Sequence, residues 1–295
     1  MPLASLRDGR TLAWSEGGDP RGRPVLFFHG CPDTRRAAGS GYDAAQQLGV
    51  RLIAANRPGY GASTPAPPSY GRVADDAAAL ADQLGLDGFG VLGMSVGGTF
   101  ALACAAFHPE RVRAAALVAT PGEAPLMDPP WTRDDLDPDG RAWYAALAVG
   151  GLDENVETVR LGFLAYRSRV APDDPDDTAL AERWVSGLPD EDRSLLAART
   201  PADLAADARE ALLVPDGYLN DAALVFRRWP FEVAEVRCPV TLWYGERDAN
   251  APPRNGRWLA DRLPDATLQL LPGLGHLESL MRSWPDILRS AAPSA

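Results

Sequence analysis

The sequence predicts an α/β fold in which a mainly parallel sheet is covered by helices and interrupted by a helical insertion. Short apolar runs alternate with helix-like stretches through the first 120 residues, strand-like runs disappear over residues 121–235, and two more follow later. Strands that alternate with helices are typical of a parallel sheet, because each crossover needs a connecting helix. We therefore expect an α/β core made of residues 1–120 and 236–295, with a helical cap (lid) over residues 121–235.

The elements of the first part are expected in regular order. A strand follows the Asp8-Gly9 turn, and the apolar run Pro24–Phe28 reads as a strand buried on both faces. The stretch Val73–Leu84 has helical spacing and a high alanine content. In chain order we expect strands at 10–14, 24–28, 50–55, 89–92 and 114–119, and helices at 73–84 and 97–107.

The insertion and the last part are expected to contain mostly helices followed by two strands. Thr200-Pro201-Ala202-Asp203 has the residues of a helix start, with Thr at the N-cap and Pro at the first position. Pro215-Asp216-Gly217 reads as a turn before a helical run over 218–228, and Asp173–Asp177 reads as a solvated loop. Strand signals resume at 240–244 and 267–271. Both ends of the insertion lie where strands end, so it should lie over the carboxyl edge of the sheet, where open parallel sheets bind ligands.

Composition excludes several classes of protein. The chain has 295 residues and a formal charge of −11, so no nucleic-acid partner and no recruitment to an anionic membrane is expected. No apolar run approaches the roughly 20 residues of a membrane span, and the N-terminus lacks the apolar segment of a secretory signal. The cysteines (Cys31, Cys104 and Cys238) are odd in number and far apart, which suits a reducing cytoplasm. The composition leaves open whether the chain forms a homodimer.

The strongest local signal is Gly93-Met94-Ser95-Val96-Gly97-Gly98, which lies between an apolar run and a helix-like stretch. Strand, tight turn and helix are the context of a nucleophile elbow, in which a serine sits on a strained turn between small residues. The overlapping pattern Gly88-x-Gly90-x-x-Gly93 matches a dinucleotide fingerprint. Its glycines fall inside the strand and not at the helix start, which argues against a nucleotide cofactor. No cofactor is expected.

A serine nucleophile requires a base and an acid. His276 lies in a glycine-rich loop after the last strand, whereas His29 directly follows a strand and His108 ends a helix, so His276 is the expected base. Asp248 follows the strand 240–244 and is the expected acid, because the order Ser95, Asp248, His276 matches the Ser-acid-His order of a large hydrolase fold. Glu246 lies two residues away and Glu123 is a second alternative. With no His or Cys pair at ligand spacing, no metal site is expected.

Acyl transfer also needs two fixed donors for the oxyanion. The amide of Val96 is adjacent to the nucleophile. The amide of Cys31, in the loop after the strand 24–28, is the expected second donor, since Gly30 permits a tight approach and Pro32 has no amide hydrogen. Cys31 as a nucleophile is the weaker interpretation, because no base is placed for it.

Together these motifs resemble the α/β-hydrolase fold superfamily with a helical lid. The resemblance rests on His29-Gly30-x-Pro32, Asn56-Arg57-Pro58-Gly59-Tyr60-Gly61-x-Ser63, Gly93-x-Ser95-x-Gly97-Gly98, His108-Pro109-Glu110-Arg111-Val112, Gly245-x-x-Asp248 and Gly275-His276. It covers almost the whole chain apart from residues 121–235. It implies a mostly parallel eight-stranded sheet with the cap inserted after the sixth strand. It also supports Ser95, Asp248 and His276 as the triad, and Cys31 and Val96 as the oxyanion-hole donors.

Departures from the family patterns narrow the function. Dehalogenases and epoxide hydrolases of this superfamily use Asp where Ser95 stands, which argues against both activities. The loop His29–Arg35 is loosely similar to that of proline iminopeptidases, but Asp33 replaces a glycine. Tryptophans of the cap could line an apolar substrate pocket or could pack the cap; they are Trp131, Trp143, Trp184 and Trp229.

The sequence therefore predicts a serine hydrolase that cleaves a small-molecule carboxylic ester without metal or cofactor. Other acyl or carbon–carbon bond hydrolysis is the alternative, including lactonase, amidase and proline iminopeptidase-like activity. A non-hydrolytic ligand-binding protein on the same fold is the rival class, because the fold alone does not determine function.

Overall fold

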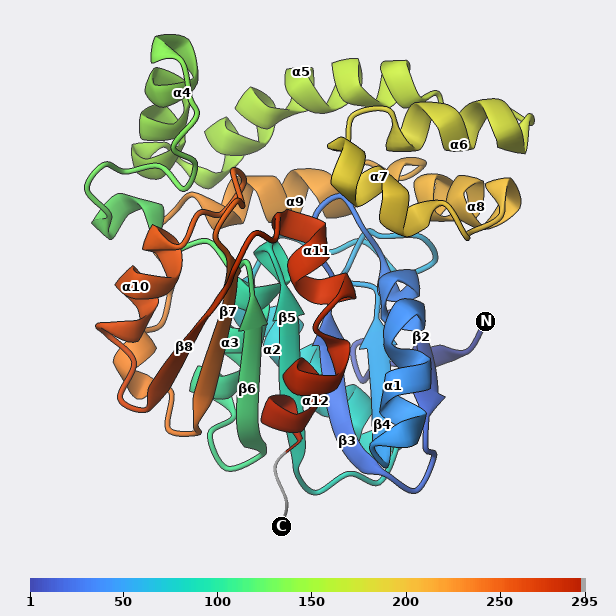
Figure 1. The fold of residues 1–295 in the computed structure, drawn as a ribbon, viewed down its shortest axis with the longest axis vertical. Coiled ribbons are helices and arrows are strands. Elements are labelled where there is room, and N and C mark those ends of the chain that lie inside the picture. The colour runs from blue at the N-terminus through green and yellow to red at the C-terminus, as the bar shows by residue number, and fades with distance from the viewer. Residues whose placement is uncertain (293–295) are drawn as a thin grey trace.

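A computed structural model describes residues 1–292 and contains an eight-stranded sheet with helices on both faces and over one edge (Figure 1). The strand order is β1-β2-β4-β3-β5-β6-β7-β8. The pairs β1·β2 and β2·β4 are antiparallel and the remaining pairs are parallel. The strands are β1 (Leu3–Ser5), β2 (Thr11–Gly18), β3 (Arg23–Phe28), β4 (Val50–Ala55), β5 (Phe89–Met94), β6 (Val112–Val118), β7 (Val240–Gly245) and β8 (Ala266–Leu271).

The central strands are mostly apolar, as expected of strands that helices cover on both faces. All six residues of β5 are buried, and so are six of the seven residues of β6. The edge strand β8 has no fully buried residue. Burial therefore falls from the middle of the sheet to its edge, which places β5 and the turn after it at the centre of the molecule.

Two layers of helices sandwich the sheet. On one face α2 and α3 pack against a core that includes Phe89 and Phe100, and on the other face α1 and α12 pack against Phe27 and Leu52. Trp284 at the start of α12 contacts Phe27 with ring centroids 5.9 Å apart. The core helices are η1 (Arg35–Gly41), α1 (Tyr42–Gln47), α2 (Tyr70–Gln83), α3 (Val96–Phe107), α10 (Arg254–Ala260), α11 (His276–Met281) and α12 (Trp284–Ala291).

The insertion (residues 121–235) is helical and lies over the carboxyl ends of the parallel strands (Figure 1). Its helices bury a small apolar cluster of their own, in which Leu147, Phe163 and Leu212 take part. Because the helices of the insertion bury apolar side chains against one another, the segment packs without a strand of its own. Its elements are η2 (Ala124–Leu126), α4 (Pro138–Val149), α5 (Leu152–Val170), α6 (Asp177–Val185), α7 (Asp190–Leu196), α8 (Pro201–Leu212), α9 (Asp216–Val225) and η3 (Val233–Glu235).

Most of the expected elements are confirmed, with shifts at their ends. The expected helix start at Thr200 is confirmed, since its hydroxyl accepts the amide of Asp203 at 3.2 Å. The strand β1 was not expected, because three residues are too few to show the alternation of apolar and polar side chains that marks a strand. The first predicted strand, 10–14, runs as β2 to Gly18, since it pairs along its length with β4.

One prediction for the insertion was wrong. Pro215-Asp216-Gly217 is not a turn, since α9 begins at Asp216. Gly217 packs against Tyr60 so closely that a Cβ there would lie 2.4 Å from the tyrosine ring. The solvated loop predicted at Asp173–Asp177 is confirmed up to Asp176, since Asp173 and Asp176 are exposed and α6 begins at Asp177. Asp176 caps α6, and its neighbours pair at the surface with arginines of the surrounding helices.

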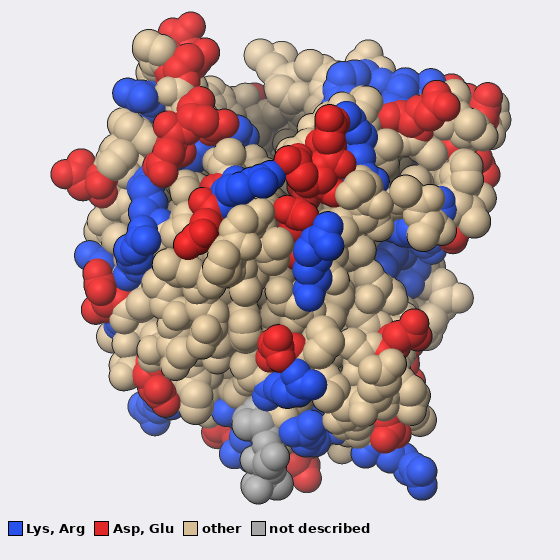
Figure 2. Space-filling view, in the orientation of Figure 1, with Lys and Arg blue, Asp and Glu red and all other residues tan. Residues whose placement is uncertain are grey.

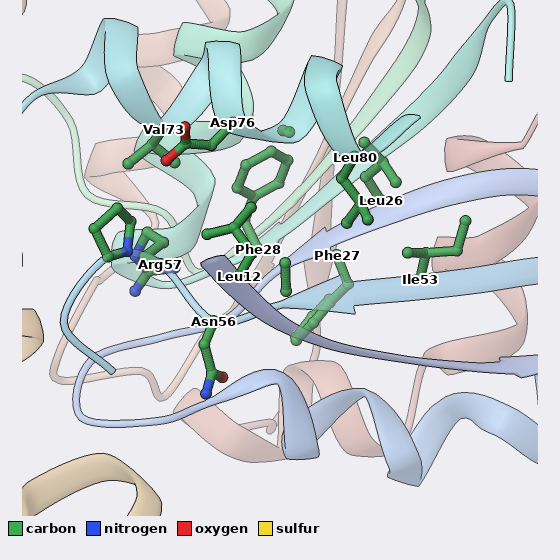
Figure 3. A pocket seen from close by; sticks show the side chains of 13 residues that line it. Leu12, Leu26, Phe27, Phe28, Ile53, Asn56, Arg57, Val73, Asp76 and Leu80 are labelled. Atoms are coloured by element: carbon green, nitrogen blue, oxygen red, sulfur yellow. The ribbon is translucent and has the colours of Figure 1, made fainter. Parts of the chain in front are cut away.

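The surface carries interleaved acidic and basic side chains and is hollowed between α4 and α7, above the sheet edge (Figure 2). None of the helices in residues 1–292 is long and apolar enough to cross a membrane. A separate cavity of about 30 Å³ lies beneath α2, where Val73, Asp76 and Leu80 face Leu26 and Phe28 (Figure 3). Its walls are mostly apolar and do not include Ser95, so it is a packing gap and not the candidate active site.

Gly162→Ala should stabilise the protein by about 0.5–1 kcal/mol, because alanine restricts the unfolded chain and suits a helix interior. Gly162 is an exposed residue within α5, and a Cβ there would meet nothing within 4 Å. Gly90→Ala is the contrasting variant, since its Cβ would lie 1.8 Å from the carbonyl oxygen of Ala291. Urea unfolding should shift in opposite directions for the two variants, and a shift of the same sign would contradict this packing.

Candidate active site

Ser95 occupies a strained turn between β5 and α3. Its φ is +53° and its ψ is −128°, outside the regions that a residue with a side chain normally adopts. The surrounding backbone holds it there, because the Ser95 amide donates to the Val118 carbonyl at 2.8 Å and the Ser95 carbonyl accepts the Gly98 amide at 2.9 Å. The strain projects Ser95 from the end of the central strand, at the N-terminus of a helix.

Three glycines make this turn sterically accessible. A Cβ on Gly93 would lie 2.4 Å from the Cα of Gly98, and one on Gly97 would lie 2.1 Å from the Phe28 carbonyl oxygen. A Cβ on Gly98 would lie 1.8 Å from the hydroxyl oxygen of Thr120. The requirement for small residues at 93 and 97 is confirmed, and position 98 is equally restricted.

Asp248 and His276 meet at the same edge of the sheet. Asp248 follows β7 and has a fully buried side chain, and its Oδ2 lies 2.7 Å from Nδ1 of His276, the first residue of α11. The other carboxylate oxygen accepts the amides of Asn250 and Ala251 at 2.8 and 2.9 Å. These bonds hold the carboxylate, which in turn orients the imidazole so that Nε2 is free for proton transfer.

Ser95, Asp248 and His276 follow β5, β7 and β8 respectively, at the carboxyl ends of these strands. Among residues 1–292 no hydrogen bond joins the Ser95 hydroxyl to the imidazole of His276, so the nucleophile–base contact is the one link of the predicted triad that is not closed here. In unliganded enzymes such bonds are often long and shorten only when substrate binds.

The other two histidines have structural partners. His29 is completely buried, and its Nδ1 lies 2.9 Å from the Gly30 carbonyl oxygen while Nε2 accepts the Arg57 amide at 3.4 Å. Burial holds the pKa of His29 well below its usual value. His108 ends α3, and its Nε2 lies 3.1 Å from Asp75. Both arrangements agree with the choice of His276 as the candidate base.

The alternative acids are placed away from the imidazole or engaged by other partners. Glu123 is buried, accepts the Trp229 amide at 2.8 Å and pairs with Arg228 at 3.1 Å. Glu246 is exposed. Asp248 is therefore the acid that the structure brings to His276.

Cys31 borders the site as a half-buried thiol, and its sulfur accepts the Tyr60 hydroxyl at 3.4 Å. Burial raises the pKa of Cys31 to about 12, so the thiol stays protonated at neutral pH and is a poor nucleophile. A Cβ on the preceding Gly30 would lie 3.7 Å from the Cβ of Ser95. The loop that carries the Cys31 amide therefore runs beside the candidate nucleophile.

The four tryptophans occupy different environments. Trp229 is buried and stacks on Phe231 with centroids 5.4 Å apart, so it packs the core. Trp131 contacts Arg141, and Trp143 is 38% exposed and packs against Phe226 with ring centroids 5.8 Å apart. Trp184 is half-buried against the apolar cluster of the insertion. Their proposed contact with substrate stays a prediction.

Two tyrosines of the insertion, which the sequence patterns did not single out, lie close enough to Cys31 for its charge to influence their pKa values. Tyr166 of α5 and Tyr218 of α9 stack with centroids 6.4 Å apart. Burial raises the pKa of Tyr166 to about 12, with smaller contributions from Cys31 and Asp33, and it also raises the pKa of Tyr218. No local motif marks these residues, because only the fold of the insertion brings them over the sheet edge.

Asp33 is a second residue that the motif analysis missed as part of the site. The Cβ of Asp33 lies 4.0 Å from the position that a Cβ of Gly30 would occupy, on the glycine that also borders Ser95. Its Oδ1 accepts the Thr34 amide at 2.7 Å. Burial raises the pKa of Asp33 to about 7, so its charge changes near neutral pH. The sequence feature that could have identified Asp33 is its position in the loop that follows His29.

No three His, Cys, Asp or Glu side chains within residues 1–292 converge to hold a metal ion. The arrangement offers instead a strained serine, an imidazole oriented by a buried carboxylate, and a neighbouring loop of backbone amides. These groups suit nucleophilic attack on a carbonyl followed by transfer of a proton.

Comparison with known proteins agrees with this class of site. The family model of the alpha/beta hydrolase fold matches residues 23–280, and the chain belongs to this family. A pimeloyl-acyl-carrier-protein methyl ester esterase from Chromobacterium violaceum is 35% identical over 256 residues, with 84% of this chain and 85% of that protein covered. A non-heme chloroperoxidase from Streptomyces lividans is 32% identical, with 98% and 96% covered.

Solved structures share the fold. A hydrolase from Pseudomonas aeruginosa PA01 superimposes with a TM-score of 0.68 at 19% identity, with 99% of this chain and 98% of that chain covered. At this identity the likeness concerns the fold alone. The family and its relatives support a hydrolytic enzyme.

The Cys31 thiol should react with iodoacetamide at pH 8 at least about 100-fold more slowly than an exposed cysteine, because a thiol with a pKa of about 12 is ionised to only about one part in 10⁴ at this pH. Val149→Cys provides the comparison, since Val149 is 86% exposed. Mass spectrometry of the labelled peptides identifies the reacting residue. Rapid labelling of Cys31 would restore it as a candidate nucleophile.

Asp33→Asn should raise the free energy of unfolding by about 4 kcal/mol at pH 8 and by little at pH 4, since each unit of pKa difference corresponds to about 1.4 kcal/mol. The folded pKa of about 7 exceeds the unfolded value of 3.8, so the native state keeps a proton that the unfolded chain loses between these pH values. The protonated Asp33 side chain therefore contributes to stability at low pH, and this contribution is lost as pH rises toward 7. Urea unfolding from pH 4 to 8 measures the difference, with exposed Asp265→Asn as the control. A difference independent of pH would contradict the raised pKa.

Proposed function

We propose that this chain is a serine hydrolase that cleaves small-molecule carboxylic esters through an acyl-enzyme on Ser95. The observation that carries the proposal is the 2.7 Å bond between Asp248 and His276 at the sheet edge where Ser95 stands on a strained turn. Two further features support the proposal. The neutral thiol at Cys31 leaves serine as the nucleophile, and an ester as the substrate is favoured by the Chromobacterium violaceum relative, which is named as a methyl ester esterase.

In the proposed reaction, Nε2 of His276 removes the proton from the Ser95 hydroxyl as Oγ attacks the ester carbonyl carbon. Asp248 stabilises the imidazolium that forms. The carbonyl oxygen becomes an oxyanion, which the amides of Val96 and Cys31 would bind. When the intermediate collapses, the alkoxide leaves with the proton from His276 and the acyl group remains on Ser95.

Water then completes the cycle by the same route. His276 takes a proton from water, hydroxide attacks the acyl carbon, and the second intermediate releases the carboxylic acid as His276 returns its proton to Ser95. The stacked Tyr166 and Tyr218 give the insertion an aromatic surface near Cys31, which suits the apolar part of an acyl or alcohol group.

Ser95→Ala and His276→Ala should each lower kcat for p-nitrophenyl acetate by at least about 10³-fold, because members of a triad act as a unit. His108→Ala is the matched control and should retain normal turnover, since His108 pairs with Asp75 away from Ser95. A fluorophosphonate probe should label the wild type stoichiometrically and should not label Ser95→Ala.

A series of p-nitrophenyl esters of increasing chain length, together with lactone and amide substrates, tests the choice of ester. Faster turnover of a lactone or an amide than of every ester would move the proposal to another acyl hydrolase. Folded wild-type protein that neither reacts with the probe nor turns over any substrate would favour a binding protein and would overturn the proposal.

A further inference from the structure

We propose that Asp221, contributed by α9 of the insertion, is a positioning residue for the oxyanion hole and acts through the buried guanidinium of Arg57. The inference rests on the proposed hydrolase function, since it concerns the donor that would bind the oxyanion. It assigns a role to an ion pair that the reaction scheme itself does not use.

Arg57 binds the backbone at the end of β3. Its Nη1 donates to the carbonyl oxygen of His29 at 2.6 Å and its Nη2 donates to that of Gly30 at 3.0 Å. Only 4% of Arg57 is exposed, so water is a poor substitute for these bonds. The guanidinium therefore helps to fix the orientation of the peptides after His29, together with the His29 imidazole, whose Nδ1 lies 2.9 Å from the same Gly30 carbonyl oxygen.

The peptide bond between Gly30 and Cys31 connects this contact to the oxyanion hole. It is trans, since the cis bonds of the described chain follow Cys31 and Asp128. In a trans peptide the C=O and N–H groups point in opposite directions. Because Arg57 binds the Gly30 carbonyl, the Cys31 amide points away from Arg57. This peptide borders the nucleophile, as the 3.7 Å approach between Gly30 and the Cβ of Ser95 shows.

Asp221 holds Arg57 from the other side. Its carboxylate accepts Nε of Arg57 at 3.0 and 3.2 Å and Nη2 at 2.5 Å, and its Oδ2 also accepts the Tyr60 hydroxyl at 2.8 Å. The Cζ atom of Arg57 lies 4.7 Å from the ring centre of Phe100 on α3. A planar guanidinium held by a carboxylate, two carbonyls and a ring has one orientation available. Without the carboxylate, the donors to His29 and Gly30 lose their alignment.

Other ion pairs between the insertion and the core lack this connection. Arg36 binds Asp207 of α8 at 2.5 Å and Arg35 binds Glu210 of α8 at 3.0 Å. Among the described hydrogen bonds, neither arginine side chain reaches the carbonyl of His29 or Gly30. A role in anchoring the insertion would be shared by all these pairs, whereas a role in orienting the Cys31 amide belongs to Asp221 and Arg57.

The test compares Asp221→Asn with Asp207→Asn in the full-length enzyme. For p-nitrophenyl acetate, Asp221→Asn should lower kcat by about 10- to 100-fold with KM within about threefold, since a displaced oxyanion donor acts mainly on the transition state. The inhibition constant of phenylboronic acid should rise by a similar factor, because the tetrahedral boronate anion would use the same donors. Asp207→Asn should change each quantity by less than about threefold.

Equal effects of the two substitutions would overturn the inference, and so would a rise in KM alone. If Asp221→Asn does not fold, the double variant Arg57→Met with Asp221→Leu removes both buried charges and leaves neither unpaired. It should fold, with kcat lowered at least about 10-fold, because the His29 carbonyl loses its donor and the Gly30 carbonyl keeps only the contact with the His29 imidazole. Wild-type kcat in this variant would overturn the inference.

The kinetic measurements on the wild type, Ser95→Ala and Asp221→Asn also distinguish failure of the proposed hydrolase function from failure of the proposed role of Asp221. Wild-type turnover that is lost in Ser95→Ala supports the hydrolase whatever Asp221→Asn does. An inert wild type would overturn the proposed function, and this inference with it.

Discussion

The chemistry of the site depends on how closely the N-terminus of α3 packs against the carboxyl ends of β3 and β6. Gly97 touches the last carbonyl of β3, and Gly98 touches Thr120 just beyond β6, at distances where no other residue would fit. Because these contacts leave no room for adjustment, the turn between them takes the strained conformation seen at Ser95. Strain of this kind persists only when the surroundings outweigh it, and here the buried central strands of the sheet provide that support.

The insertion contacts the site from two directions and does more than cover it. On one side Asp221 reaches the loop after β3 through Arg57. On the other side Asp192 of α7 accepts the amide of Glu278 in α11, the helix that begins with His276. Buried charges are costly to desolvate, so they are weak evidence for stability and stronger evidence for a required geometry. Both contacts tie the position of the insertion to groups around Ser95.

The residues predicted from sequence share a physical property. Ser95 directly follows β5, and Asp248 and His276 lie within about five residues of the ends of β7 and β8, in short segments where glycine marks a turn. Their place at the sheet edge therefore follows from the strand pattern. Asp33 and Asp221 were not predicted. A single acidic residue in a loop or a helix is common, and only its burial against a specific partner distinguishes it from a solvated one.

By itself the sequence determined the alternation of strands and helices in the core, the helical character of the insertion and, to within a few residues, where most core strands end. These features are encoded locally, in periods of two or 3.6 residues and in turns that need glycine. Only the tertiary structure decided which side chains of the insertion lie near Cys31 and which carboxylate pairs with Arg57. Those contacts join residues more than a hundred positions apart, and packing between separate helices, which has no short-range signal, brings them together.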